Sequence, residues 1–282
     1  MPVPSNNINT NVSVIIPCYC ASGTLWRAVN SVLSQTVPPK EIILVDDASP
    51  DNGKTKNVIN EVAQHVNTLN MGIQVLPIFL LNNIGPGGAR NAGWAIASQE
   101  WLAFLDADDS WHPEKLHIQT TWLGAHPEII LCGHTSEVFN EDADLILVDE
   151  LKYTPVSLID MLISNSFPTR SVLLRSHLSL RFIEDRCEDY YLWLSVISAG
   201  MKAARLNLPL AFCYREEFSP GGYSANLWEH EKGELRCLLR LQNSGNLSLF
   251  LSFFAIIWSL LKYLRRLIRC YFRYFCEFNG RP

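Results

Sequence analysis

The feature that most constrains the fold of this chain is an alternation of short apolar runs with amphipathic stretches over its first 105 residues. The apolar runs predict strands at 12–16, 41–45, 73–81 and 101–105, and the stretches between them predict helices near 25–33, 54–67 and 87–98. Continuous apolar strands that alternate with helices are typical of a parallel sheet covered on both faces. Because crossovers are right-handed, the pattern favours a Rossmann-like α/β fold over an antiparallel sandwich, whose strands would follow one another without helices.

The second half of the chain follows this pattern less regularly. Helices are predicted at 113–125, 158–164, 188–199 and 225–243, and strands at 129–132, 171–175 and 210–214. Gly200 takes the position just after a helix end, where glycine is favoured. Residues 133–152 form an acidic, mixed stretch, and residues 216–224 are predicted to be a loop.

Acidic residues follow two of the predicted strands. Asp46-Asp47 ends the second strand, the sequence Asp106-Ala107-Asp108-Asp109 ends the fourth, and Tyr19 lies just beyond the first. The carboxyl ends of parallel strands form the ligand-binding edge of such a sheet, so these carboxylates converge and need a cation or hydrogen-bond donors between them. An all-oxygen site suits Mg²⁺ or Mn²⁺. The alternative is that the D-A-D-D sequence is only a turn that ends a strand.

Composition and cysteine usage exclude several functional classes. The chain has 28 acidic and 23 basic residues, with a net charge of −5, so it has no general basic field for nucleic acid. The start shows no basic segment followed by an apolar one, and no two of the eight cysteines have C-x-x-C spacing. We therefore expect a cytoplasmic protein with free thiols and no zinc knuckle.

Four motifs occur in a characteristic order along the chain. They are VSVIIPCYCASGTL, EIILVDDASPD, NNIGPGGARNAG and WLAFLDADDSWHPEKL, and the second half of the chain adds RFIEDRCEDYYLWL. In this order and spacing, residues 12–215 resemble the inverting glycosyltransferases of family 2, which have the GT-A fold. The chain departs from the family pattern at Cys20, where an Asn usually follows the Tyr.

The resemblance implies roles for five residues in binding a nucleotide-sugar. Pro17 and Tyr19 would border the nucleotide base, with Tyr19 stacking on it, and Asp47 would accept a hydrogen bond from a uracil-type base. Arg90 would lie near the base or the diphosphate, and Asp106 near the ribose. The alternative for Arg90 is a solvated arginine at a helix start.

The resemblance also implies where metal and acid–base chemistry take place. Asp108 would bind the Mn²⁺ or Mg²⁺ ion that bridges the donor diphosphate, and Asp189, in the pair Glu188-Asp189, would be the general base. Acidic residues at a helix start are often caps that complement the helix dipole, so this remains an alternative for both. Trp193, one turn later, either lines the acceptor pocket or belongs to the core.

The function implied is the transfer of a sugar from a UDP-linked donor, a nucleotide-sugar, to a hydroxyl of a saccharide or lipid-linked saccharide. The transfer would proceed with inversion. Such enzymes of bacteria commonly serve polysaccharide or lipopolysaccharide assembly. A non-catalytic sugar-nucleotide binder or scaffold of the same fold is the main alternative. A nucleotidyltransferase would need a basic, glycine-rich loop after the first strand. An NAD site would need a glycine-rich turn after the first strand, whereas the glycines of residues 85–88 follow the third.

The C-terminal segment is both apolar and basic. Residues 247–261 contain 12 apolar residues in 15, and five basic residues follow: Lys262, Arg265, Arg266, Arg269 and Arg273. The apolar run is shorter than the ~20 residues that cross a bilayer. It predicts a helix that lies on the cytoplasmic face of the inner membrane. The alternatives are a helix that buries its apolar face on the protein and a helix that spans the membrane. The expected division is a tail at 1–11, a GT-A catalytic domain at 12–218 and C-terminal helices at 219–282.

Overall fold

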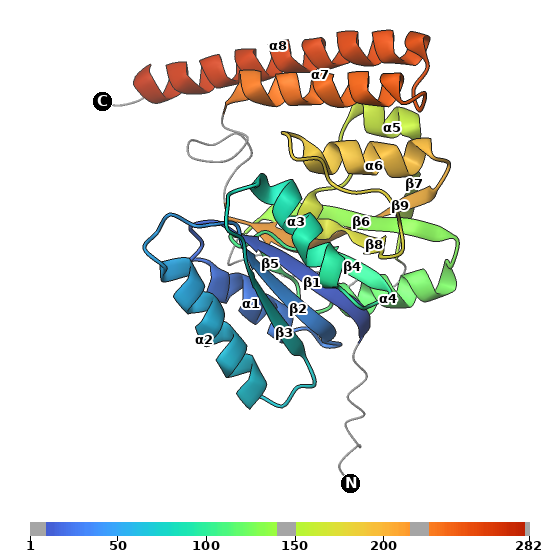
Figure 1. Ribbon diagram of the computed structural model, residues 1–282. Helices are drawn as coiled ribbons and strands as arrows, with labels where there is room; N and C mark the ends of the chain where they lie inside the picture. The colour runs from blue at the N-terminus through green and yellow to red at the C-terminus, as the bar shows by residue number, and fades with distance from the viewer. Residues whose placement is uncertain (1–9, 140–150, 215–225, 280–282) are drawn as a thin grey trace.

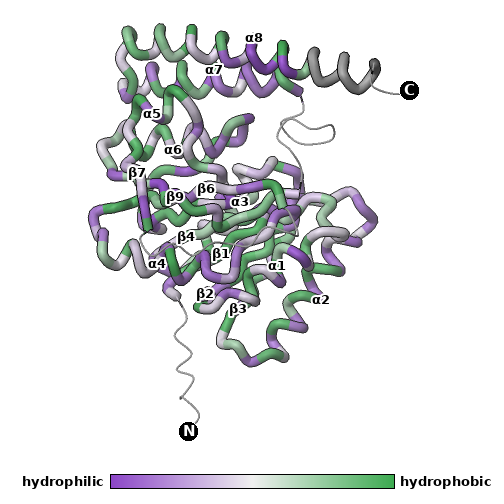
Figure 2. The backbone as a smooth tube through the Cα atoms, turned by 180° about the vertical axis from the view of Figure 1, so that it is seen from behind, coloured by the Kyte–Doolittle hydropathy of each residue, from purple (hydrophilic) through white to green (hydrophobic). Residues whose placement is uncertain are grey.

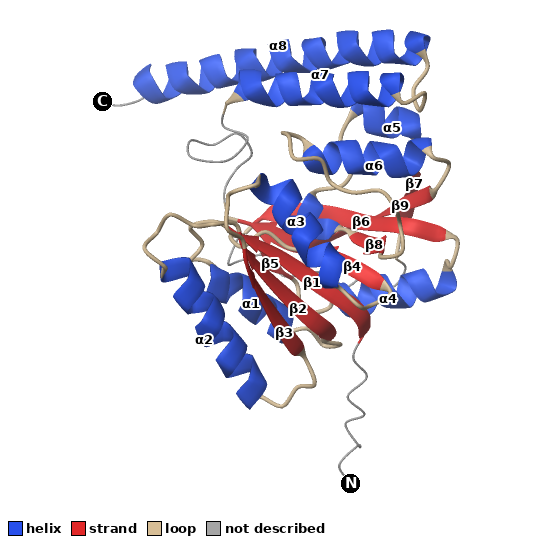
Figure 3. Cartoon of the chain, viewed as in Figure 1, coloured by secondary structure: helices blue, strands red, loops and turns tan. Residues whose placement is uncertain are grey.

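The computed structural model describes residues 10–139, 151–214 and 226–279, with side chains described to residue 270. A nine-stranded sheet has the order β3-β2-β1-β4-β8-β6-β9-β5, and β7 pairs with β9 (Figures 1 and 3). The strands are β1 Thr10–Cys18, β2 Pro39–Asp46, β3 Gln74–Phe79, β4 Trp101–Phe104, β5 Ser110–Trp111, β6 Ile129–Val138, β7 Tyr153–Val156, β8 Leu173–Arg175 and β9 Lys202–Cys213.

Helices cover both faces of this sheet. The helices are α1 Leu25–Leu33, α2 Lys54–Thr68, α3 Gly85–Ile96, α4 Lys115–Ala125, α5 Leu158–Ile163, α6 Glu188–Ser198, α7 Leu227–Asn243 and α8 Leu249–Asn279, and a short 3₁₀ helix, η1, spans Thr169–Ser171. Helices α1, α2 and α4 share a core with one face of the sheet, and α3, α5, α6, α7 and α8 share a core with the other. None of the helices, as far as they are described, is long and apolar enough to cross a bilayer.

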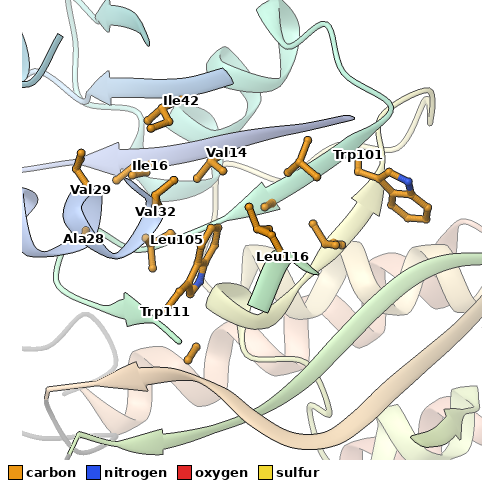
Figure 4. Packing of buried hydrophobic residues seen from close by; sticks show 14 of the residues in the cluster. Val14, Ile16, Ala28, Val29, Val32, Ile42, Trp101, Leu105, Trp111 and Leu116 are labelled. Carbon is orange, nitrogen blue, oxygen red and sulfur yellow. The ribbon is translucent and has the colours of Figure 1, made fainter. Parts of the chain in front are cut away.

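Strands β3, β2, β1 and β4 are all parallel, which is the arrangement that the alternating pattern predicted. β8 is antiparallel to both β4 and β6, whereas β6 and β9 are again parallel. The prediction of a Rossmann-like, mostly parallel sheet with helices on both faces and a C-terminal helical extension is confirmed. Successive side chains of a strand point to opposite faces, so Val14 and Ile16 pack toward α1 (Figure 4) and Ile15 packs toward α3. The central strands are accordingly apolar along most of their length (Figure 2).

The structure extends two predicted strands by six residues or more and adds two strands. β6 continues six residues past the predicted end at 132, and β9 begins eight residues before the predicted start at 210. The two strands pair with each other through shifts in register, so polar residues within them are stabilised by backbone hydrogen bonds rather than by apolar periodicity. β5 has only two residues, and β7 contains Pro155 and pairs with β9 alone. Neither length nor composition marks such strands in a sequence.

The C-terminal helices share the core of the α3 face. Cys237, Leu238 and Leu241 of α7, with Leu247 and Ala255, are buried in the same cluster as strand residues of the sheet. The predicted domain boundary at 218/219 lies outside the described residues. The division into tail, catalytic domain and C-terminal helices therefore stays a prediction.

Candidate active site

Three parallel strands bring chemically active residues to one edge of the sheet. β1 and β2 stay in register to their ends, where Cys18 pairs with Asp46. Tyr19 follows β1 with 53% of its surface exposed, so its ring is available for stacking, and Pro17 is half-buried just before it. Residues 106–109 follow β4. These strand ends, together with the first turns of α3 and α6, form the candidate site (Figure 1).

The two acids at the end of β2 hold loops in place. Asp46 accepts hydrogen bonds from the backbone N–H and the hydroxyl of Ser49, which closes the turn after the strand. Asp47 is buried, and its Oδ1 accepts the backbone N–H of Ile84 at 2.8 Å. Burial raises the pKa of Asp47, although backbone donors from the α3 loop oppose the shift. Asp47 therefore joins the end of β2 to the loop that begins α3.

Arg90 on α3 connects the D-x-D motif with the start of α6. Its guanidinium donates to Asp106 Oδ1 at 2.6 Å and to Glu188 Oε1 at 2.7 Å. Burial opposes the charge of Arg90, but these carboxylates outweigh it and keep the pKa of Arg90 above its ordinary value. The resemblance placed Arg90 near the base or the diphosphate. The structure gives it two acidic partners, one on each side of the candidate site, and the link to Glu188 was not predicted.

The acidic pair at the start of α6 is divided between two environments. Glu188 is buried against Arg90, and burial raises its pKa to about 7 despite the attraction of the guanidinium. Asp189 is only partly buried, and its Oδ2 accepts a hydrogen bond from the hydroxyl of Thr169 at 2.9 Å. Its Oδ1 accepts the backbone N–H of Tyr190. Each oxygen of Asp189 retains capacity for a further hydrogen bond, so the carboxylate can accept a proton.

The 3₁₀ helix η1 supplies two partners that sequence reasoning missed. Thr169 holds Asp189, and the next residue, Arg170, forms an ion pair with Asp109 at 2.6 Å. Burial, and after it the charge of Asp106, raises the pKa of Asp109 to about 7 although Arg170 opposes this. The only sequence signal was the convergence of several acids, which requires a counter-charge from a distant segment.

Asp108 has the most available carboxylate of the D-A-D-D turn. Its backbone oxygen accepts a hydrogen bond from Arg27, but its carboxylate makes no hydrogen bond or ion pair with any residue that the structure describes. Among those same residues, no cluster of three or more His, Cys, Asp or Glu side chains is arranged to hold a metal ion. Of the three carboxylates in the turn, that of Asp108 is the one that keeps its oxygens available to a ligand.

Gly87 allows α3 to approach the segment before α6. A Cβ atom at this position would lie 2.4 Å from the backbone oxygen of Ile183 and 2.9 Å from Cγ of Glu188. We expect Gly87→Ala to lower the free energy of unfolding by about 1–3 kcal/mol, because α3 must shift away from α6. Urea denaturation followed by circular dichroism measures this change.

Gly124 on α4 is the matched control for that substitution, because no atom lies within 4 Å of a Cβ built there. Gly124→Ala should leave stability unchanged or raise it slightly, since alanine favours a helix. Equal unfolding free energies for the two variants would contradict the close packing of α3 against α6.

Other predicted residues lie elsewhere. Trp193 is fully buried and contacts Phe104 and Phe182, so it belongs to the core rather than to an acceptor pocket. The predicted loop at 216–224 lies outside the described residues. Tyr214, just before it, was not assigned a role beyond starting this loop. Its ring stacks with the guanidinium of Arg27 at 3.6 Å, beside the D-A-D-D turn.

Comparison with curated proteins finds bacterial glycosyltransferases. The Escherichia coli UDP-Glc:alpha-D-GlcNAc-diphosphoundecaprenol beta-1,3-glucosyltransferase WfaP is 29% identical over 211 residues, which are 70% of this chain and 74% of that protein. The putative teichuronic acid biosynthesis glycosyltransferase TuaG of Bacillus subtilis is 29% identical over 78% of this chain and 84% of its own length. An uncharacterized glycosyltransferase of Nostoc sp. is 47% identical over 105 residues, and this chain spans only 30% of it.

Solved structures confirm the GT-A fold at low identity. Staphylococcus aureus TarS in complex with UDP-GlcNAc has a TM-score of 0.62 and 19% identity, with 83% of this chain and 67% of that chain covered. A mannosyltransferase of Pyrobaculum calidifontis, in complex with GDP-Man and Mn²⁺, has a TM-score of 0.60 and 15% identity, with 93% and 75% covered.

The family comparison agrees with the position of the candidate site. The matching family model covers residues 13–176, which is more than half of the chain and includes most of β1, all of β2 and β4, Arg90 and the D-A-D-D turn. This is the stretch that places the strand-end carboxylates at one edge of the sheet. The chain belongs to glycosyltransferase family 2.

Proposed function

We propose that this glycosyltransferase moves a sugar from a UDP-linked donor to a hydroxyl of a saccharide or lipid-linked saccharide, with inversion and with metal assistance. The observation that carries the proposal is the placement of Asp189. Its carboxylate is fixed by Thr169 at the start of α6, and its neighbour Glu188 is joined through Arg90 to Asp106 of the D-x-D motif. The two ion pairs of Arg90 therefore connect Asp106, on the side that would bind the donor, with the start of α6, on the side that would activate the acceptor.

In the proposed reaction the acceptor hydroxyl gives its proton to Asp189 while its oxygen attacks the anomeric carbon. The bond between that carbon and the diphosphate breaks as the new glycosidic bond forms. The nucleoside diphosphate leaves from the opposite face. A single displacement inverts the configuration at the anomeric carbon, so an α-linked donor yields a β-linkage.

The donor would be held by residues at the strand ends. Tyr19 offers an exposed ring for stacking on the base, with Pro17 beside it, and Asp47 would accept a hydrogen bond from the base. Asp106 would lie near the ribose, held in orientation by Arg90. A divalent cation, Mn²⁺ or Mg²⁺, bound at Asp108 would neutralise charge on the leaving diphosphate.

The names of similar proteins support these choices. WfaP is named for a UDP-Glc donor and a diphosphoundecaprenol-linked acceptor, and the TarS structure holds UDP-GlcNAc. TuaG is named for teichuronic acid biosynthesis, and the structure of the Pyrobaculum calidifontis mannosyltransferase holds Mn²⁺. These names favour an acceptor in polysaccharide assembly. We propose polysaccharide or lipopolysaccharide assembly as the setting, with the enzyme peripheral on the cytoplasmic face of the inner membrane. A thermal-shift screen of UDP- and GDP-sugars with Mn²⁺ tests the choice of nucleotide.

Removing the proposed metal ligand tests metal-dependent donor binding. We expect Asp108→Ala to abolish the binding of UDP that depends on Mn²⁺, because no other carboxylate of the turn is free of a protein partner. Titration calorimetry with UDP, in the presence and absence of Mn²⁺, measures the loss.

Glu61→Ala is the control for this titration. It removes the same charge from the exposed face of α2, away from the strand ends, and should leave UDP affinity unchanged. Equal affinities for Asp108→Ala and the unsubstituted protein would refute the metal assignment. A protein that binds UDP but releases none from any sugar donor would instead favour a non-catalytic binder.

A further inference from the structure

Helix α8 presents most of its large apolar residues to solvent, and the side that faces the protein carries buried serines beside Leu251, Ala255 and Ile256. Ser252 and Ser259 are buried, with 1% and 2% of their surfaces exposed. Large apolar residues cover the opposite side of the helix for more than five turns, which is the reverse of an ordinary surface helix. These residues, here named the α8 apolar surface, are Leu249, Phe250, Phe253, Phe254, Ile257, Trp258, Leu260, Leu261, Leu264, Leu267 and Ile268.

Polar contacts with α7 fix this rotation of α8. The hydroxyl of Ser259 is 2.8 Å from Glu231 and 2.9 Å from Glu234, both of which are buried between the two helices. Arg266 pairs with Glu234 at 2.6 Å, and Lys262 pairs with it at 3.1 Å. Turning α8 to bury its apolar side would leave two buried carboxylates without these partners, which is costly. α8 thus packs on the protein through Leu251, Ala255 and Ile256, and leaves its larger apolar residues exposed.

The apolar surface continues onto a neighbouring helix. The indole N–H of Trp258 donates to the backbone oxygen of Ile163 at 2.9 Å, at the end of α5. About half of the surface of Ile159 and of Ile163 is exposed beside it. α8 lies at the outside of the molecule, over α7 and α5 (Figure 1). The exposed face is thus a continuous patch rather than a row of isolated side chains.

Basic residues border this patch. Arg265 and Arg269 are exposed and lie on the same side of α8 as Trp258, and they form no ion pair with any described residue. The last 40 residues contain six Lys and Arg and a single Glu, in a chain whose net charge is −5. An uninterrupted apolar face flanked by unpaired arginines complements an apolar layer under anionic head groups.

We propose that the α8 apolar surface docks on a bilayer that contains anionic lipid, with α8 parallel to the membrane and its apolar side chains below the head groups. The inference deepens the proposed function by naming the surface that would bring the enzyme to a lipid-linked acceptor. A second copy of the chain is the competing occupant. The two free arginines favour lipid, because two such faces packed together would add basic charge without supplying acids to match it.

The docked helices are joined to the segment that carries the proposed base. Arg236 and Arg240 of α7 both pair with Asp185. A Cβ at Gly233 would lie 2.9 Å from Cβ of Arg186, so α7 packs closely on the residues just before Glu188. Membrane contact through α8 would therefore hold the start of α6 at a fixed distance from the lipid surface.

Co-sedimentation of the full-length protein with vesicles tests the proposal. The vesicles contain phosphatidylcholine alone or phosphatidylcholine with phosphatidylglycerol. We expect the protein to bind the anionic vesicles, and the double variant Phe253→Gln/Leu264→Gln to lower the partition coefficient by at least about tenfold. The variant Arg265→Gln/Arg269→Gln should lose most of the preference for phosphatidylglycerol.

The matched control is Leu81→Gln, because Leu81 is a large apolar residue that is 96% exposed after β3, far from α8 in the chain. It should bind vesicles as the unsubstituted protein does. Point variants are preferred to a chain ending at Gly245, since that chain would lose Leu247 and Ala255 from the core and would leave Glu231 and Glu234 without their α8 partners. Unchanged thermal unfolding shows that each variant is folded.

Two results would overturn the proposal. One is that the protein binds neither kind of vesicle, or that the variant Phe253→Gln/Leu264→Gln binds them as well as the unsubstituted protein does. The other is a lipid-free dimer in sedimentation velocity that the same double variant dissociates, which assigns the surface to a second copy. The thermal shift with UDP and Mn²⁺ is measured on every variant. A normal shift without vesicle binding refutes only the docking, and vesicle binding without a shift refutes only the proposed function.

Discussion

Asp189→Asn will lower turnover by at least about 100-fold and leave donor binding unchanged, because a general base acts on the chemical step rather than on the ground-state complex. Asparagine retains the size of the side chain, and its amide oxygen can accept the N–H of Tyr190 while its NH2 donates to the hydroxyl of Thr169, but it cannot take the proton of the acceptor. Steady-state release of UDP with a saturating acceptor measures turnover. Titration calorimetry with the donor analogue UDP and Mn²⁺ measures binding.

Glu184→Gln is the control for this experiment. Glu184 begins a second acidic pair four residues before Glu188, but it is exposed and lies outside α6, so turnover should stay within about twofold of the unsubstituted rate. Near-normal turnover of Asp189→Asn would place the base elsewhere, with Glu188 and Asp109 the next candidates. Slow turnover with weakened donor binding would show that Asp189 serves the structure of the site instead.

Arg90→Met will lower the free energy of unfolding by about 3–5 kcal/mol, because it leaves a buried glutamate and its partner aspartate without their shared cation. Glu188 is 6% exposed, and its pKa is already raised to about 7 with the guanidinium present. Urea denaturation monitored by circular dichroism measures the loss. The double variant Arg90→Met/Glu188→Gln should recover part of it, because the substitution removes the buried charge.

Arg175→Met is the matched control for Arg90→Met. Arg175, like Arg90, forms an ion pair with a carboxylate, but its partner Glu100 is about half exposed to solvent. Exposed pairs contribute little, so the expected loss is under about 1 kcal/mol. A loss of that size at Arg90 as well would mean that the bridge between Asp106 and Glu188 does not stabilise the fold.

The sequence predicts the first half of the fold well because each strand and helix there shows the apolar pattern of its own type. In β1, Val14 and Ile16 face one core and Ile15 faces the other, so a continuous apolar run is required. The second half depends on pairing between distant strands. β6 and β9 extend beyond their apolar runs because each completes the backbone hydrogen bonds of the other, and this stabilisation leaves no periodic mark.

The same distinction between local patterns and contacts of distant residues decides which parts of the candidate site could be predicted. Asp47 and residues 106–109 were found because a strand end fixes where their side chains go. The pairing of Arg90 with Glu188 joins residues 98 positions apart, and the pairing of Arg170 with Asp109 joins residues 61 apart. No local pattern specifies these contacts. Convergence of the acids predicted that cations must be present, but not which arginines would supply them.

The orientation of α8 was also beyond the reach of composition. An apolar and basic segment is compatible with a helix that is buried, interfacial or spanning. The choice depends on Glu231 and Glu234, which belong to another helix. Ser252 and Ser259, seven residues apart, lie on one side of the helix and were the available sign that this side is polar.

The guanidinium shared by Asp106 and Glu188 restricts how chimeric enzymes of this kind can be made. A natural crossover point lies after the D-A-D-D turn, so that one parent would supply donor recognition and the other acceptor recognition. The two pieces then inherit different members of one charge triad, and a parent without an acid at the position of Glu188 leaves Arg90 half-paired in the interior. Productive crossovers should therefore take Arg90, Asp106 and the start of α6 from the same parent.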